Sequence, residues 1–312
     1  MKLAMVFPGQ GSQSIGMMAG FDAHPAIRAT FDEASAVLGQ DLWALVTSGP
    51  EADLSRTVNT QPIMLTAGVA VWRAWLAAGG ARPVVVAGHS LGEYTALVAA
   101  DALAFADAVP LVRFRAEAMQ AAVPAGVGAM AAILGLDAAA VTDACAAASS
   151  GSGQVVEPVN FNAPEQIVIA GHKEAVERAI AIATEKGAKR GVLLPVSAPF
   201  HSSLMKPAAD RLAARLATVD IRPPAIPVLH NASVTEQTTP EGIRAALAAQ
   251  AASPVRWVET IRAFAAQGVT HVVECGPGRV LSGLNKRIAR ELTSYALTDG
   301  ADLDAAKTAL AV

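Results

Sequence analysis

Short apolar runs alternate with longer stretches of helical periodicity along much of the chain. Three such runs, at residues 3–7, 84–87 and 270–274, each end at glycine or proline or shortly before them. Runs of this kind are typical of strands that are buried on both faces of a sheet. Helical patterns lie between the first two runs, and a helical stretch at 279–291 follows the third. We therefore expect an α/β fold with a mostly parallel sheet.

The middle of the chain has a different order of elements. It predicts a strand at 129–134, a helix at 137–148, strands at 155–160 and 166–170, a helix at 173–186 and a strand at 188–194. This βαββαβ order is that of a ferredoxin-like unit. We expect a small subdomain at 125–196, inserted into a large α/β domain formed by 1–124 and 197–312. The cleft between them is the natural place for a ligand.

The composition narrows the class of protein. Of 312 residues, 53% are apolar, 16% are charged and the formal net charge is −3, which argues against a basic surface for nucleic acid or an anionic membrane. The uncharged stretch 121–136 is too short and too rich in glycine to span a membrane. With only Cys145 and Cys275, the chain has no disulfide framework or multi-cysteine metal site. We expect a cytoplasmic protein without metal or prosthetic group.

The sequence Gly-His-Ser-Leu-Gly at residues 88–92 matches a nucleophile elbow, in which a serine lies on a sharp turn between a strand and a helix. The predicted strand at 84–87 and a helix at 93–100 stand on the correct sides. Gly88 and Gly92 leave room for the close approaches that the turn imposes. Ser90 is therefore a candidate nucleophile, and the alternative is an inert serine in a glycine-lined turn.

A serine nucleophile needs a base, and histidine is the usual one near neutral pH. His201 lies in a loop that contains Pro199, where the small subdomain would return to the large one. It is therefore a candidate base. The remaining histidines are better explained as solvated, core or elbow-flanking side chains: His24, His89, His172, His230 and His271.

Arg115 projects from the apolar face of the helical stretch 107–119. A buried arginine is too costly to leave unpaired, so it needs a structural carboxylate or an anionic ligand. Arg113 falls on the opposite side, where it can pair with Glu117 in solvent. Both interpretations of Arg115 stay open from the pattern alone.

Five segments in the same order resemble the malonyl-CoA:acyl-carrier-protein transacylases of bacterial fatty-acid synthesis, over almost the full length of the chain. They are Phe-Pro-Gly-Gln-Gly-Ser-Gln at 7–13, Thr-Gln-Pro at 60–62, Gly-His-Ser-Leu-Gly-Glu-Tyr at 88–94, Asn-Phe-Asn at 160–162 and Glu-Cys-Gly-Pro-Gly at 274–278. The resemblance implies a hydrolase-like α/β domain with a ferredoxin-like insert. It also implies transfer of malonyl from malonyl-CoA to acyl carrier protein through an ester on the serine.

The resemblance assigns roles to individual residues. Ser90 would carry the acyl group, His201 would be its base, and Arg115 would bind the malonyl carboxylate. The backbone carbonyl of Gln250 would orient the histidine, and the backbone N–H groups of Gln10 and Leu91 would form the oxyanion hole. Met119, Asn160 and Asn162 correspond to residues near the acyl pocket.

Phe200 resembles the aromatic residue found before the histidine in malonyl-selective acyltransferase domains. Its ring would crowd the methyl group of methylmalonyl, although a core phenylalanine is the alternative. The carrier protein of this family is acidic, so a basic surface is expected, with residues 189–190 and 286–287 as candidates. We expect a monomer.

Other functions fit parts of this pattern. The elbow alone fits a serine esterase or thioesterase equally well, although Arg115, the insert and the place of His201 before the strand at 270–274 argue against it. A non-catalytic module that binds the carrier protein is a further alternative. The carrier could also belong to polyketide synthesis.

Overall fold

The computed structural model describes residues 1–196 and 198–311. It contains two sheets. The large sheet has the order β7-β2-β1-β8-β9, and its neighbouring strands pair in parallel. Its strands are β1 (Leu3–Phe7), β2 (Val85–Gly88), β7 (Val228–Leu229), β8 (His271–Cys275) and β9 (Thr293–Leu297). The predicted α/β class and parallel sheet are confirmed.

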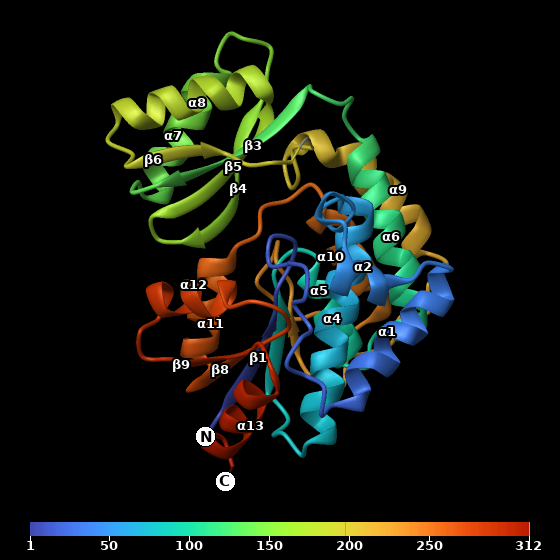
Figure 1. Ribbon diagram of the computed structural model, residues 1–312. Helices are drawn as coiled ribbons and strands as arrows, with labels where there is room; N and C mark the ends of the chain where they lie inside the picture. The colour runs from blue at the N-terminus through green and yellow to red at the C-terminus, as the bar shows by residue number, and fades with distance from the viewer. Residues whose placement is uncertain (197, 312) are drawn as a thin grey trace.

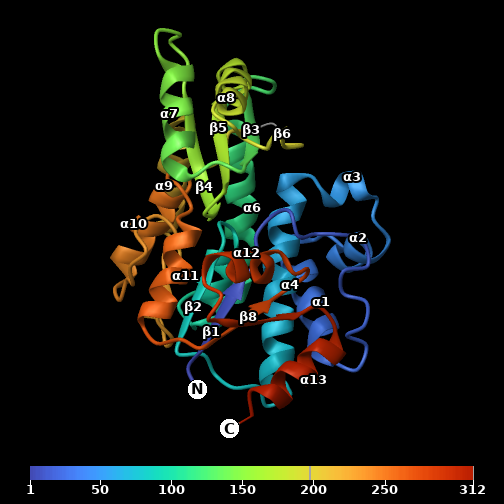
Figure 2. The same ribbon diagram turned by 90° about the vertical axis from the view of Figure 1, so that its left-hand side faces the viewer.

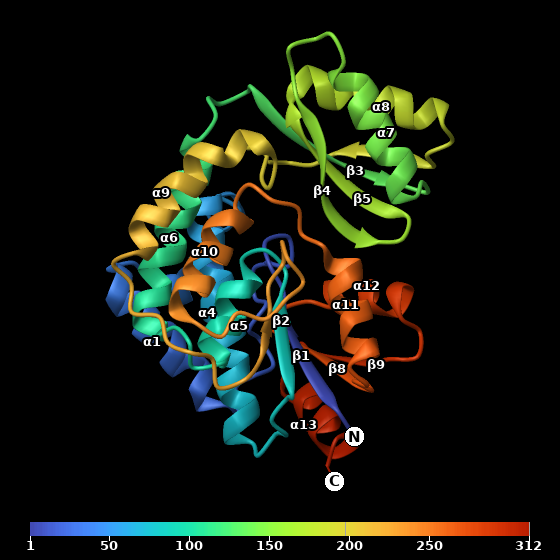
Figure 3. The same ribbon diagram turned by 180° about the vertical axis from the view of Figure 1, so that it is seen from behind.

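Helices cover both faces of this sheet (Figures 1 and 3). Along β1, Met5 and Phe7 pack into the larger apolar core, whereas Ala4 and Val6 pack into the core on the other face. The larger core is formed with α1 (Pro25–Leu38), α2 (Leu42–Ser48), α3 (Glu51–Leu54), α4 (Thr57–Ala77), α5 (Gly92–Ala99), α6 (Phe105–Ala121), α9 (Lys206–Leu216), α10 (Pro240–Gln250) and α13 (Gly300–Ala309). Helices α11 (Trp257–Ala266) and α12 (Val280–Ile288) cover the other face. Strands β1 and β2 are therefore apolar throughout, because both of their sides are buried.

The small sheet lies at one end of the large one, with two helices packed on it (Figure 2). It is antiparallel, in the order β4-β5-β3-β6. Its elements are β3 (Gly128–Leu134), α7 (Ala138–Ser149), β4 (Val156–Ala163), β5 (Gln166–His172), α8 (Lys173–Glu185) and β6 (Arg190–Leu193). The order along the chain is βαββαβ, as predicted. A short 3-10 helix, η1 (Ser203–Met205), follows the return to the large sheet.

Several predicted limits differ from the structure. The last predicted helix ends at Ile288 and not at 291, because Ala289 is extended. Strands β7 and β9 were not predicted, since neither is a long apolar run. Residues 197 and 312, where the predicted large domain resumes and ends, lie outside the described residues, and the domain limits stay a prediction. Within the described part of the chain, no helix combines the length and apolarity needed to cross a bilayer.

Candidate active site

Ser90 lies on a strained turn between β2 and α5. Its φ of +51° is in the left-handed region, which a residue with a side chain seldom adopts. A Cβ on Gly88 would lie 1.9 Å from the carbonyl carbon of Gly92, so the turn closes only because residue 88 has no side chain. Strand, turn and helix therefore form the elbow geometry that the motif predicts.

Asn231, just after β7, clamps this turn. Its Oδ1 accepts a hydrogen bond from the backbone N–H of Ser90 at 2.7 Å, and its Nδ2 donates to the carbonyl oxygen of Gly88 at 2.6 Å. The side chain is buried. These two bonds satisfy backbone groups that the strained turn leaves without partners, and they hold its shape.

His201 faces the serine. Its Nε2 lies 2.7 Å from Ser90 Oγ, and its Nδ1 lies 2.8 Å from the backbone carbonyl oxygen of Gln250. A carbonyl oxygen only accepts, so Nδ1 carries the proton and Nε2 is free to accept the serine proton. Burial and then the charge of Arg115 lower the pKa of His201 to about 3, so the ring is neutral near pH 7.

Arg115 projects from α6 into the same place. Its Nη2 donates to Ser90 Oγ at 3.1 Å and to Gln250 Oε1 at 2.9 Å, and its Nη1 donates to Gln61 Oε1 at 2.9 Å. The side chain is 1% exposed. Burial lowers the pKa of the guanidinium, which still starts far above neutral pH and stays protonated. The pattern therefore placed this cation correctly on the apolar face of its helix.

The loop after β1 packs directly against the elbow. A Cβ on Gly9 would lie 2.5 Å from the carbonyl oxygen of His89 and 3.8 Å from the backbone nitrogen of Leu91. This contact brings Gln10 beside Leu91, and both residues line the cavity above Ser90. An oxyanion hole needs two backbone N–H donors near the nucleophile, and Gln10 and Leu91 stay the predicted donors.

A cavity of about 350 Å³ opens over Ser90. Its walls come from the loops after β1 and β2, from α4 and α6, from the small sheet and from the loop that carries His201. The lining residues are Gln10, Gly11, Gln13, Ser55, Gln61, His89, Ser90, Leu91, Arg115, Met119, Met130, Asn160, Leu194, Pro195, Val196, Phe200 and His201. A cavity with apolar walls and a few convergent polar groups suits a small acyl chain on a thioester.

The remaining predicted site residues occupy different places around this cavity. Met119 and Asn160 line it, and Phe200 packs between apolar clusters that contain Met119 on one side and Met130 on the other. Asn162 is not among the lining residues. Its Oδ1 lies 2.8 Å from Nε2 of His89, which does line the cavity, so Asn162 supports the wall from behind.

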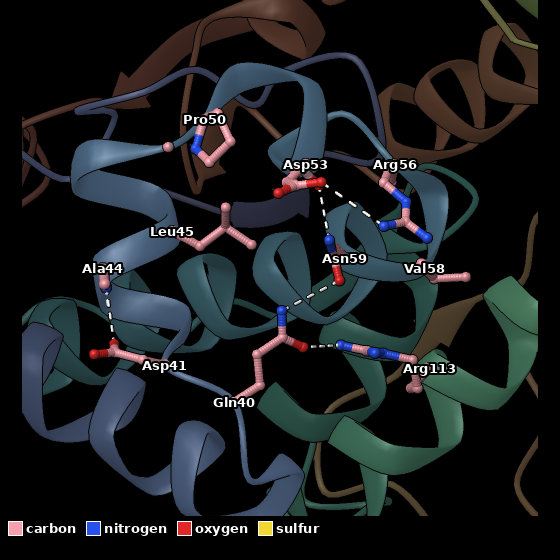
Figure 4. A pocket seen from close by; sticks show the side chains of 11 residues that line it. Gln40, Asp41, Ala44, Leu45, Pro50, Asp53, Arg56, Val58, Asn59 and Arg113 are labelled. Atoms are coloured by element: carbon pink, nitrogen blue, oxygen red, sulfur yellow. Dashed lines mark hydrogen bonds and ion pairs between the residues drawn. The ribbon is translucent and has the colours of Figure 1, made fainter.

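A second cavity, of about 460 Å³, lies between α2, α3, α4 and α6 (Figure 4). Arg113 lines it and donates through Nη2 to Gln40 Oε1. Gln40 in turn donates to Asn59, whose Nδ2 donates to the carbonyl oxygen of Asp53. Arg113 was expected to be an ordinary solvated residue; it is half-buried and joins this chain of hydrogen bonds. Several polar groups of this cavity therefore bind one another.

Sequence reasoning gave no role to three residues of the site. Gln61 and Glu93 lie inside the Thr-Gln-Pro and Gly-His-Ser-Leu-Gly-Glu-Tyr segments, whereas no motif of the sequence marks Asn231. Glu93 is buried and accepts from Gln250 Nε2 at 3.0 Å and from the backbone N–H of Asn231 at 2.9 Å. Among the residues described, no group of three His, Cys, Asp or Glu side chains could hold a metal ion.

The fold and the site together define an acyltransferase, and comparison with known proteins agrees. Residues 4–300 match the acyl transferase domain family, to which this chain belongs. It is 54% identical to the malonyl CoA-acyl carrier protein transacylase of Salmonella typhimurium, over 98% of this chain and 99% of that protein. It is 47% identical to the protein of the same name in Bacillus subtilis, over 96% and 94%.

Solved structures are similar over the same length. The acyl-carrier-protein S-malonyltransferase of Burkholderia pseudomallei is 59% identical, with a TM-score of 0.97 over 99% of this chain and 100% of that one. A malonyl-transacylase solved in complex with a type II PKS acyl-carrier protein is 51% identical, with a TM-score of 0.97 over 99% and 100%.

Proposed function

We propose that the chain transfers malonyl from malonyl-CoA to the phosphopantetheine thiol of acyl carrier protein, through an ester on Ser90. The observation that carries this proposal is the buried guanidinium of Arg115, whose Nη2 lies 3.1 Å from Ser90 Oγ. A hydrolase of neutral esters has no use for a buried cation beside its nucleophile. An acyl group that ends in a carboxylate supplies the anion that this cation needs.

In the first half-reaction, His201 Nε2 takes the proton of Ser90 Oγ as the oxygen attacks the thioester carbonyl. The backbone N–H groups of Gln10 and Leu91 hold the oxyanion, and each such donor lowers the barrier by about 3 kcal/mol. When the C–S bond breaks, His201 returns the proton to the CoA sulfur. The neutral ring and its fixed tautomer suit both proton transfers.

In the second half-reaction, the carrier thiol gives its proton to His201 and attacks the malonyl ester. The ester C–O bond breaks, and Ser90 recovers the proton. Throughout, Arg115 holds the malonyl carboxylate by two parallel charge-assisted hydrogen bonds, which a guanidinium can make and an ammonium cannot.

We also propose that the acidic carrier protein docks on basic residues beside the cavity. Lys286 and Arg287 are exposed on α12, and Arg287 Nη2 donates to Gln166 Oε1 of the small sheet at 2.7 Å. Lys189 and Arg190 are exposed at the start of β6. Arg287 therefore links α12 to the small sheet, and these four charges are the candidate docking surface.

The chain is proposed to act as a cytoplasmic monomer, without nucleic acid, membrane or prosthetic group. Cys145 and Cys275 are free and buried, which fits a reducing compartment. The resemblance of the five sequence segments to transacylases of fatty-acid synthesis favours that carrier protein, and the polyketide complex noted above keeps a polyketide carrier as a second candidate.

The experiment is intact-mass measurement after a brief incubation with malonyl-CoA alone, comparing the wild type with Ser90→Ala, followed by addition of carrier protein. We expect a malonyl adduct on the wild type only, discharged onto the carrier. Steady release of CoA with no adduct and no loaded carrier would instead identify a thioesterase. Separate fatty-acid and polyketide carriers decide between the two pathways.

A further inference from the structure

The buried carboxylate of Glu93 has no part in the mechanism above. Glu93 lies in the first turn of α5, three residues after Ser90, and its side chain is 0% exposed. Its Oε2 accepts from the backbone N–H of Asn231 and from Nε2 of Gln250. Because these groups can only donate, they match an ionised carboxylate. A buried anion of this kind needs a compensating cation.

His230 does not supply that cation. Its Nδ1 lies 2.7 Å from Glu93 Oε1, and its Nε2 is buried with no hydrogen-bond partner among the described residues. A cationic ring would bury an N–H group without an acceptor, whereas a neutral ring protonated on Nδ1 leaves only an unused lone pair. The geometry therefore fits a neutral His230 that donates to Glu93.

Arg115 is the complementary case, a buried cation without a carboxylate in contact. Its hydrogen-bond acceptors among the described residues are three neutral oxygens, on Gln61, Ser90 and Gln250. The side chain of Gln250 lies between the two charges. Its Oε1 accepts from Arg115 and its Nε2 donates to Glu93, at 2.9 and 3.0 Å. The opposite amide orientation would set donor against donor and acceptor against acceptor.

We propose that Glu93 is the positioning residue for Arg115, acting through the side-chain amide of Gln250. The Glu93 carboxylate fixes the orientation of the Gln250 amide, and the amide oxygen holds the Arg115 guanidinium. The negative charge of Glu93 thereby compensates the positive charge of Arg115 without direct contact between the two side chains. A carboxylate in direct contact would compete with the malonyl carboxylate for the same N–H groups. An intervening amide avoids that competition. This inference rests on the proposed function, because it concerns how the malonyl group is recognised.

The alternative is a purely structural role, in which Glu93 holds Asn231 and thereby the elbow. Loss of the carboxylate would then slow acylation of Ser90 by any acyl group to the same extent. The two roles are distinguished by comparing malonyl-CoA with acetyl-CoA, since acetyl has no carboxylate for Arg115 to bind.

The test is the rate of Ser90 acylation in Glu93→Gln, which keeps the shape and removes the charge, and in Glu93→Asp, which keeps the charge. For Glu93→Gln we expect a higher KM for malonyl-CoA and a malonyl-to-acetyl ratio of kcat/KM about tenfold lower, within the coupling found for groups of one network. Glu93→Asp should recover part of the ratio. The matched control is Glu33→Gln, which removes an exposed carboxylate paired with Arg73 and should leave the ratio unchanged.

Two further variants keep the result decisive. In the double variant Glu93→Gln with Arg115→Ala, the ratio should fall no further than in Arg115→Ala alone. If Glu93→Gln does not fold, Gln250→Met decides the question, because it removes the amide and keeps the backbone carbonyl for His201. Equal losses for both acyl groups, or additive losses in the double variant, would overturn the proposal. Failure of the wild type to form a malonyl adduct would instead refute the proposed function.

Discussion

Replacing Arg115 by alanine tests how the site chooses its acyl group. The guanidinium is buried beside Ser90 Oγ and is held by Gln61 and Gln250. Its removal takes away the partner of the malonyl carboxylate but leaves Ser90 and His201 in place. Malonyl transfer should therefore fall steeply, while acylation by an uncharged acetyl group should persist or improve.

The size of the effect follows from the contacts. A bidentate pair between guanidinium and carboxylate has two charge-assisted hydrogen bonds, each contributing about 1.5–3 kcal/mol. Together they amount to about 3–6 kcal/mol, which corresponds to roughly 10²- to 10⁴-fold in kcat/KM at about 1.4 kcal/mol per factor of ten. Arg115→Lys keeps the charge but not the fork, so it should recover only part of this loss.

The assay is single-turnover acylation of Ser90, followed by mass, with malonyl-CoA and acetyl-CoA in parallel. The ratio of the two rates cancels any general damage from leaving the amides of Gln61 and Gln250 without a donor. Arg113→Ala is the matched control, because that arginine lies on the same helix but faces the second cavity, and it should not change the ratio. Equal losses for malonyl and acetyl in Arg115→Ala would refute the reasoning.

Three other predictions concern the base, the pocket wall and the docking surface. In His201→Ala, malonyl-CoA should acylate Ser90 very slowly. The pKa of His201 is about 3 in the folded protein and about 6.5 in the unfolded chain. Acylation of the wild type should therefore stay high well below pH 6. Between pH 6.5 and 3 the unfolded chain binds more protons at residue 201 than the folded protein does. His201 therefore lowers the free energy of unfolding as the pH falls through this range. Thermal unfolding of His201→Ala should lack this loss of stability. Phe200→Ala should raise methylmalonyl transfer relative to malonyl transfer in a direct competition assay, and an unchanged ratio would make Phe200 a core residue only. Lys286→Glu with Arg287→Glu should raise the KM for carrier protein without altering acylation by malonyl-CoA, and an unchanged KM would remove this surface from docking.

The local parts of the fold could be predicted because their signals are local. Strand β1 was predicted without error, and β2 and β8 were each displaced by one residue. The βαββαβ order of the small sheet also followed from its apolar runs. By contrast, β7 has two residues and β9 is only partly buried. Their pairing with longer strands makes them part of the sheet, and no local pattern marks that pairing.

The candidate site divides in the same way. The elbow could be predicted from the sequence alone, since a strand, a glycine-lined turn and a helix are consecutive, and the helical pattern placed Arg115 on an apolar face. Only the tertiary structure brought Asn231 to the backbone of Ser90, 141 residues away in sequence, and Gln250 to Glu93, 157 residues away. Those contacts satisfy buried polar groups whose need for partners arises only when the chain is packed. A sequence can show that a polar residue will be buried, but its partner is decided by the assembled fold.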